Sequence, residues 1–392
     1  MFKAAVGQSS DIETADAIQE VLETCEAQLD SATPTAGLLF SANVHKPRLA
    51  LDTIYQRYPD LQLVGCTTDG EMTASDGFSE ESISLVLFSS DEVKIQAGLG
   101  RDASRDPENA AKQAVAQATC DLDQTATLAI ALPDGMTTNA FLVLQHLTRE
   151  LGSEVSIVGG MSADQVIGDK NHFDTFQFCN SSVVSDALPI LLFSGPLHHS
   201  LGMESGWKPL GEKMKVTRSE GHLLCELDGK PPLEVYQHYL GEVSSNDLSG
   251  LGAYPLAVYE EHIERYYLRV PAKADPDTGH INFLGDIPNG ATVQITQAIR
   301  EEILEAAQRS FQSALDKYPG TKPAVSLLFS CTGRKLALGS KTQNEIDKAK
   351  QSAPKNLPMC GFYTFGEIGP LSHQTQARFH NTTFLTLLMG TS

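Results

Sequence analysis

Two short runs of the chain place a hydroxyl, a glycine and a carboxylate at the same spacing. Residues 65–72 read Gly-Cys-Thr-Thr-Asp-Gly-Glu-Met, and residues 361–368 read Gly-Phe-Tyr-Thr-Phe-Gly-Glu-Ile. The glycine lets the backbone adopt a positive φ or approach a ligand closely, and the carboxylate can accept hydrogen bonds from an amine, a hydroxyl or a guanidinium. We select both runs as candidate ligand sites; the alternative is a turn glycine beside a capping glutamate. The candidate residues are Thr68, Gly70 and Glu71 in the first run and Thr364, Gly366 and Glu367 in the second.

Arg334 and two histidines are further candidates for binding a ligand. Arg334 follows the apolar run 327–330 by a few residues, and the carboxyl ends of strands are where α/β sheets commonly bind ligands. Its guanidinium could hold a carboxylate or a propionate through two hydrogen bonds, or it could form a surface ion pair. His380 and His172 each lie just before an expected strand, so either imidazole could ligate iron on a pocket wall. A purely structural role is the alternative for both histidines.

Other motifs of catalysis and metal binding are missing from the sequence. The seven cysteines are scattered, with no Cys-x-x-Cys pair and no zinc spacing, so we expect reduced thiols in a cytoplasm and no covalent c-type haem. The sequence also lacks the HExxH metal motif, the GxSxG nucleophile elbow, the phosphate-binding loop and the dinucleotide-binding glycine run. We therefore do not expect an enzyme.

The spacing of apolar residues predicts alternating strands and helices that would position these candidates. In the first part of the chain, Ser10 and Glu13 have the spacing of a capping box at the start of a helix. A long amphipathic helix is expected over residues 298–315. The other expected elements are strands over 37–41, 61–64, 82–88, 324–330 and 383–389 and helices over 47–58 and 343–351.

The order of these elements repeats along the chain. Placing Gly65 on Gly361 superimposes the two Thr-x-Gly-Glu runs and also aligns residues 39–41 with residues 328–330, both Leu-Phe-Ser. A looser third copy lies between them, with a strand, a helix and a strand before Gly159. This pattern predicts an internally duplicated α/β (mixed α+β) fold of mixed β-sheets flanked by helices. A change to short, turn-rich strands near residue 195 predicts two domains, residues 1–197 and residues 198–392.

Length and charge restrict the partners of the protein. A chain of 392 residues is long enough for two domains. Its 29 Lys and Arg against 49 Asp and Glu give a formal charge of −20, which disfavours nucleic acid and anionic membranes as partners. Apolar runs are far shorter than the ~20 residues that span a bilayer, and the amino terminus lacks the apolar segment of a secretory signal. We therefore expect a cytoplasmic protein.

Taken in order, the motifs of this chain resemble the FIST family, a bacterial sensory module with FIST-N and FIST-C halves. On this resemblance, residues 1–197 form a FIST-N-like domain and residues 198–392 a FIST-C-like domain. The strings that carry the resemblance are Val64–Glu71, Leu132–Gly135, Val158–Asp164 and Leu191–Gly195 in the first half and Gly206–Pro209, Glu226–Pro231, Phe329–Arg334, Gly361–Ile368 and Phe379–Asn381 in the second.

The resemblance implies a small-ligand sensor that feeds signal transduction, with amino acids among the ligands proposed for the family. One branch, the NosP proteins, is similar in layout, with both halves and no fused output domain. That branch binds haem, senses nitric oxide and acts on a separate histidine kinase. The resemblance therefore implies haem b as cofactor, nitric oxide as signal and a sensor histidine kinase in trans as partner, and it allows a homodimer.

Two hypotheses about the ligand follow from this resemblance. In the first, His380 or His172 holds the haem iron, Arg334 pairs with a propionate, and nitric oxide weakens the iron–histidine bond. The pair His380 and Asn381 resembles FIST-C domains in general, so it does not distinguish haem-binding members. In the second hypothesis, Glu71, Glu367, Arg334 and the Thr-x-Gly backbone fix the zwitterion of an amino acid or a similar metabolite. A ligand-free scaffold is a third possibility.

Overall fold

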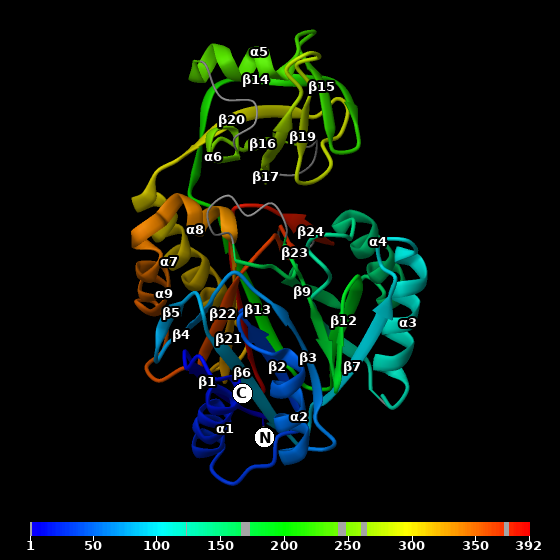
Figure 1. Cartoon of the computed structure of the whole chain (residues 1–392), viewed down its shortest axis with the longest axis vertical. Coiled ribbons are helices and arrows are strands. Elements are labelled where there is room, and N and C mark those ends of the chain that lie inside the picture. The colour runs from blue at the N-terminus through cyan, green and yellow to red at the C-terminus, as the bar shows by residue number, and fades with distance from the viewer. Residues whose placement is uncertain (1, 123, 166–172, 242–247, 260–264, 372–375) are drawn as a thin grey trace.

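Three repeats with the same order of strands build the body of the molecule, and a separate lobe stands above it (Figure 1). The computed structural model describes residues 2–122, 124–165, 173–241, 248–259, 265–371 and 376–392. Within these residues, no helix is long and apolar enough to cross a membrane.

The first two repeats run without interruption. The first repeat comprises β1 (Phe2–Ser9), α1 (Thr14–Leu29), β2 (Ala36–Ser41), α2 (Pro47–Arg57), β3 (Gln62–Thr67), β4 (Glu71–Thr73), β5 (Gly77–Ser79) and β6 (Ile83–Ser90). The second comprises β7 (Lys94–Arg101), α3 (Pro107–Thr119), β8 (Ala126–Ala131), α4 (Ala140–Leu151), β9 (Ser156–Gly160), β10 (Gln177–Cys179), β11 (Ser182–Val184) and β12 (Ala187–Ser194).

The lobe is inserted into the third repeat, after its first strand. This repeat comprises β13 (His198–Glu204), α7 (Arg300–Asp316), β21 (Val325–Cys331), α8 (Thr332–Leu338), a 3₁₀ turn (Gly339–Lys341), α9 (Gln343–Lys350), β22 (Met359–Thr364), β23 (Glu367–Pro370), β24 (Ala377–His380) and β25 (Phe384–Gly390). The lobe comprises β14 (Trp207–Glu220), β15 (Leu223–Leu227), α5 (Pro232–Leu240), α6 (Leu248–Leu251), β16 (Leu256–Tyr259), β17 (Tyr267–Arg269), β18 (Pro271–Ala274), β19 (Ile281–Phe283) and β20 (Thr292–Ala298).

Each sheet of the body combines four strands of one repeat with a hairpin from another repeat. The strand orders are β1-β6-β2-β3-β10-β11, β7-β12-β8-β9-β23-β24 and β13-β25-β21-β22-β4-β5. The hairpin β4–β5 of the first repeat joins the third, β23–β24 of the third joins the second, and β10–β11 of the second joins the first. This cyclic exchange confirms the predicted internal duplication, including the looser third copy before Gly159.

The Thr-x-Gly-Glu runs lie where the chain leaves one sheet and enters the next. Gly70 has φ 107° and Gly366 has φ 151°, values that favour glycine. Around these crossings the repeats bond to one another through their backbones: Asp69 N–H donates to Tyr363 O at 3.0 Å, and Ala163 N–H donates to Thr67 O at 2.8 Å. The positive φ allowed for by the sequence is present, and at both runs it accompanies a change of sheet.

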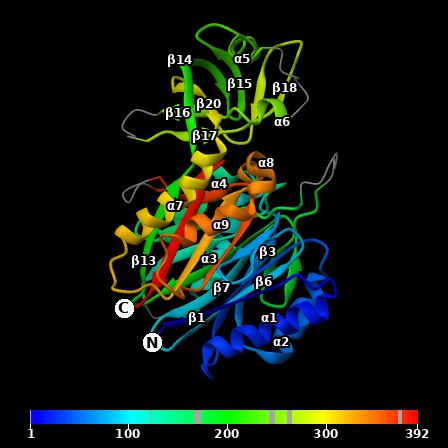
Figure 2. The ribbon, with the colours of Figure 1, turned by 90° about the vertical axis from the view of Figure 1, so that its left-hand side faces the viewer.

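The strands alternate their side chains between two cores, as period-two geometry requires. On β2, Leu38 and Phe40 face a shared inner core, and Leu39 faces the helices α1 and α2. Aromatic side chains join the repeats in the inner core: the rings of Phe40 and Phe362 are 4.4 Å apart between centroids. Helices cover the outer faces, and Figure 2 shows α7 and α9 lying over the third repeat, below the lobe.

Most of the expected elements are confirmed, and one helix start is wrong. The expected helix over 298–315 is α7 (Arg300–Asp316), and the expected helix over 343–351 is α9 (Gln343–Lys350). However, α1 begins at Thr14 with Glu13 as its N-cap and no side-chain cap. Ser10 does not cap this helix because its hydroxyl bonds to that of Ser79 at 3.0 Å. The predicted domain boundary at residue 197 falls between β12 and β13, where the third repeat begins.

We predict that Gly65→Ala destabilises the body by about 3 kcal/mol. A Cβ at this residue would lie 2.0 Å from the carbonyl oxygen of Leu39 on the neighbouring strand. Urea denaturation measures the change in the free energy of unfolding. Gly229→Ala is the control, because its φ is 79° and nothing lies within 4 Å of its Cβ; it should cost about 1 kcal/mol. Equal losses for both variants would contradict the proposed close packing.

Candidate ligand-binding cleft between the lobe and the body

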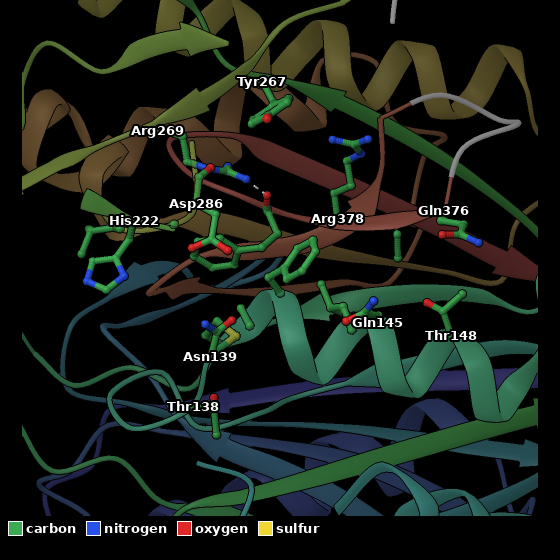
Figure 3. A pocket seen from close by; sticks show the side chains of 18 of the residues that line it. Thr138, Asn139, Gln145, Thr148, His222, Tyr267, Arg269, Asp286, Gln376 and Arg378 are labelled. Atoms are coloured by element: carbon green, nitrogen blue, oxygen red, sulfur yellow. Dashed lines mark hydrogen bonds between the residues drawn. The ribbon is translucent and has the colours of Figure 1, made fainter. Parts of the chain in front are cut away.

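A cavity of about 1250 Å³ lies where the lobe meets the second repeat (Figure 3). One wall is α4, the floor is β24 of the hairpin β23–β24, and the opposite wall comes from the lobe. Ligand pockets typically measure roughly 300–1,000 Å³, so the cleft is large enough for a metabolite or a bulkier cofactor. The polar side chains that line it include Asn139, Gln145 and Thr148 of α4, Arg378 of the floor, and Tyr267, Arg269 and Asp286 of the lobe.

Three arginines line this cleft in an acidic protein: Arg149, which pairs with Glu108 and Glu150, and Arg269 and Arg378. Arg269 is held by three carbonyl oxygens: its Nε donates to Asp286 O at 3.0 Å, and its Nη1 donates to Leu268 O at 2.9 Å and to Phe379 O at 3.2 Å. Its guanidinium lies 4.4 Å from the ring centroid of Tyr267, and that of Arg378 lies 5.5 Å from the same ring. Such cation–π contacts fix the orientation of a guanidinium while it keeps its charge.

The opposite wall presents amides, hydroxyls and apolar side chains. Figure 3 shows Gln145 and Thr148 of α4 pointing toward the hairpin that carries Arg378. Asn139 caps α4, because its Oδ1 accepts a hydrogen bond from Leu142 N–H at 3.1 Å. Phe365 and Phe379 line the floor. The cleft therefore combines charge, hydrogen-bonding groups and an aromatic surface, the usual lining of a small-molecule site.

Glu367 and His380, two of the second-half candidates from the sequence, lie on the hairpin β23–β24, whose strand β24 forms this floor. Glu367 and His380 are directly opposite each other in the β23–β24 pair, and both are fully buried. The Glu367 carboxylate accepts hydrogen bonds from Thr383, at 2.9 Å from N–H and 2.5 Å from the hydroxyl. Asn381 accepts a longer one from Val270 N–H of the lobe at 3.4 Å. These residues support the floor from below, while Gly366 lets Phe379 pack against the turn.

His380 is a neutral imidazole that bonds to the backbone. Its Nε2 donates to Gly369 O at 2.9 Å, and burial lowers its pKa to about 3. Within the described residues its Nδ1 has no hydrogen-bond partner. The ring does not line the cleft; the imidazole that does belongs to His222 of the lobe. The alternative ligand from the sequence, His172, lies outside the described residues.

The first-half candidates lie at a different crossing between sheets. Thr68 and Ser82 both donate hydroxyl hydrogen bonds to the buried Glu71 carboxyl. The second-half candidate Thr364 lies at the end of β22, where its hydroxyl donates to Met161 O at 2.6 Å. Neither Glu71 nor Thr68 lines the cleft. Burial raises the pKa of the Glu71 carboxyl to about 8 and that of Glu367 also to about 8. The predicted acids are therefore equivalent by repeat but do not share one cavity.

Arg334 is fully buried in the third repeat, away from the cleft lining. Its guanidinium forms an ion pair with Glu345 at 2.8 Å and donates to three backbone carbonyls. Sequence reasoning missed Arg378, Tyr267 and Asp286, which come from separate elements. Arg378 stands directly before the selected string 379–381, and this adjacency is the one signal that could have found it.

The chain matches known domains over most of its length. The FIST N domain matches residues 35–230, and the FIST C domain matches residues 232–370. This chain belongs to the FIST family. FIST domains are sensory ligand-binding domains of signal transduction, so the family assigns the chain a sensory role.

Two relatives in sequence carry names that do not narrow this role. An uncharacterized protein of Mycobacterium tuberculosis is 26% identical over 95% of this chain and 96% of its own length. An uncharacterized protein of Methanocaldococcus jannaschii is 30% identical, over 51% of this chain and 38% of its own length. Among solved structures, cyanuric acid hydrolase from A. caulinodans covers 100% of this chain at 8% identity and a TM-score of 0.37, which is too low to support an argument.

We predict that the two buried carboxyls make the protein less stable as pH rises. In the unfolded chain a glutamate ionises near its ordinary pKa of 4.5, whereas Glu71 and Glu367 keep their protons to about pH 8. The folded state therefore binds more protons between these values, and its stability falls as pH rises through this window. The double variant E71Q/E367Q should flatten this dependence, measured by urea denaturation between about pH 5 and pH 8.

An exposed carboxylate provides the control for this experiment. Lys112 and Arg149 hold the pKa of Glu108 at about 2, so Glu108 is ionised in both states throughout the window. E108Q should leave the slope of stability against pH unchanged. A slope that is equally steep in E71Q/E367Q and in the wild type would show that the buried carboxyls are ionised at neutral pH.

Proposed function

We propose that this FIST protein senses an amino acid or a closely similar organic zwitterion, which binds in the cleft between the lobe and the body. The observation that carries the proposal is the presence of Arg378, Arg269 and Asp286 on one cavity in a chain with a formal charge of −20. A local excess of guanidinium groups attracts anions against the field of the whole protein. Asp286 is the single carboxylate among the described residues that line the cleft, and it suits a ligand that also carries an ammonium group.

The walls of the cleft suggest how such a ligand would lie. Arg378 would pair with its carboxylate, because a guanidinium offers two parallel donors, and Asp286 would accept from its ammonium group. The aromatic floor of Phe365 and Phe379 would contact the apolar part of its side chain. Gln145 of the α4 wall would provide further hydrogen bonds. This pose transfers the ligand contacts predicted for Glu71, Glu367 and Arg334 to residues that line a cavity.

Haem binding stays a prediction of the family resemblance, and we derive no step through haem. An axial histidine must face the space that holds the iron. His380 is fully buried, and its Nε2 bonds to Gly369 O, so the described residues do not present it to the cleft. A sensor histidine kinase in trans likewise rests on the resemblance alone, and we keep it as the proposed receiver of the signal.

We predict that an amino acid raises the melting temperature of the protein and that Arg378→Gln weakens its binding about 10- to 100-fold. The loss follows from removal of one charged pair with the carboxylate. A thermal-shift screen of the protein amino acids finds the ligand, and calorimetry measures its affinity. Arg57→Gln is the matched control, because Arg57 is an exposed arginine paired with Glu26 on the first repeat. An equal effect of both variants, or a screen without a shift, would refute the proposal.

A second variant tests whether the ammonium group is recognised. Asp286→Asn should weaken binding of the amino acid and leave binding of the corresponding 2-hydroxy acid nearly unchanged, because only the amino acid offers an ammonium group. If both ligands weaken equally, Asp286 acts on the cleft as a whole and not on the ammonium group.

The haem prediction has its own spectroscopic test. If the ligand binds in the cleft and His380 has no part in binding, hemin added to the purified protein should give the same visible spectrum with and without the His380 side chain. The measurement compares the visible spectra of the wild type and of H380A after removal of free hemin. A shifted Soret band in the wild type that moves with nitric oxide and disappears in H380A would favour the haem hypothesis over the amino-acid sensor.

A further inference from the structure

Two neighbouring stretches of chain connect the lobe to the body. In the first two repeats, the first strand connects to its helix within a few residues, from Ser9 to Thr14 and from Arg101 to Pro107. In the third repeat the same connection holds the whole lobe, between Glu204 and Arg300. The exit and the return lie side by side, because Trp207 of β14 pairs with Ala298 of β20. Both covalent connections of the lobe to the body therefore lie at one place, in addition to the bonds of Arg269 and Val270 to the floor and to the loop that follows it.

A single guanidinium joins both stretches at this place. Arg334 Nη1 donates to Ser205 O at the exit, and Nη2 donates to Ile303 O in the first turn of α7 at 2.8 Å. Nη1 also lies 3.5 Å from Thr382 O, in the loop that follows the cleft floor. The exit of the lobe, its return and the end of the β23–β24 hairpin thus converge on one residue.

Glu345 of α9 holds this guanidinium in place. Its Oε1 accepts from Arg334 Nε at 3.0 Å and Nη2 at 2.8 Å, and its Oε2 accepts from Ser330 at 2.7 Å and Tyr363 at 2.6 Å. Arg334 and Glu345 are both 0% exposed. A buried ion pair contributes little net stability, because desolvation offsets the attraction. Its fixed geometry, however, orients the donors toward the carbonyls of the lobe connections.

The edges of the cleft are apolar on both sides. Leu284 of the lobe is 46% exposed, and Met136 and Phe141 of the facing wall are 48% and 56% exposed. All three line the cleft. Water contact of such side chains is unfavourable, so a lobe that swings toward α4 would gain by covering them. The lobe nevertheless leaves them exposed, so its connections and the bonds of Arg269 and Val270 to the floor and to the loop that follows it must hold its present angle.

We propose that Arg334, anchored by Glu345, is a positioning residue that sets the angle of the lobe over the cleft. It acts through the backbone of the two lobe connections and does not touch the ligand. The inference depends on the proposed function only for the nature of the ligand, and it can be tested on the ligand-free protein.

The test measures a distance between the lobe and the body. Cys120 is the exposed one of the seven cysteines and lies at the end of α3, and Glu234→Cys adds a second label site on the exposed side of α5. Nitroxide labels on both report the distance distribution by pulsed electron resonance. In this labelled background, Arg334→Lys keeps the charge but loses the fork that bonds the carbonyls, so we expect a shifted distribution about twofold broader than that of the parent.

Two milder variants keep the test valid if Arg334→Lys fails to fold. Glu345→Gln removes the charge of the anchor and should broaden the distance distribution more. Tyr363→Phe removes one hydroxyl bond to Glu345 and should broaden it less. Lys341→Ala is the control, because it breaks an exposed ion pair with Glu301 of 2.9 Å close to the same helices and should change nothing. Circular dichroism and melting temperature establish that each variant is folded.

The outcomes separate a positioning role from a structural one. If the folded variants are less stable but keep the parent distance distribution, Arg334 only stabilises the third repeat and the inference is wrong. A changed distance distribution supports the positioning role of Arg334 even if no amino acid binds. Failure of the proposed function can therefore be distinguished from failure of this inference. If an amino acid binds, Arg334→Lys should weaken it about tenfold, although no ligand contact is removed.

Discussion

Every sheet of the body depends on a hairpin from another repeat. Without it, β3, β9 and β22 would each present an open edge, because the partner strands β10, β23 and β4 come from elsewhere in the chain. Unpaired backbone groups at such an edge are costly when buried. The exchange therefore binds the three repeats into one folding unit, and it requires the chain to change sheets at each crossing. Gly70 and Gly366 occupy those crossings with positive φ, and the carboxyls that follow them are buried as a consequence.

This arrangement explains why the third repeat can carry a lobe and why a cleft forms beside it. The hairpin β23–β24 of the third repeat reaches into the sheet of the second, and its outer strand becomes a floor. The lobe stands over this floor because it is inserted into the same repeat that supplies the hairpin. Arg269 of the lobe donates a hydrogen bond to Phe379 O of the floor, so the lobe and the floor are joined directly. The wall opposite them, α4, belongs to the second repeat, and the cleft therefore draws on two repeats and the lobe.

Besides the exposed ion pairs of the surface, two kinds of charged groups differ in their surroundings. The first kind is the buried ion pair. Arg334 and Glu345 join two helices of the third repeat, and Lys335 and Asp69 join segments far apart in sequence. Arg378 and Asp286 line an open cavity, where a ligand can reach them. Sequence reasoning treated Arg334 and Glu367 as ligand contacts because their types and their place near strand ends suit such chemistry. Their burial comes from packing between repeats that share little sequence, which no local pattern records.

The sequence by itself determined the alternation of strands and helices, the duplication and the FIST family, because these depend on periodic apolar residues and on short strings such as 64–71 and 361–368. It also selected His380 and Asn381 as candidates; they lie at and just after the end of β24, and neither lines the cleft. Only the tertiary structure decided which residues meet across the cleft. More than a hundred residues separate Asn139 from Tyr267, and more than a hundred separate Tyr267 from Arg378. The cyclic exchange of hairpins and the insertion of the lobe bring them together. Both are pairings between distant strands, whose register depends on the whole core and not on the local residues.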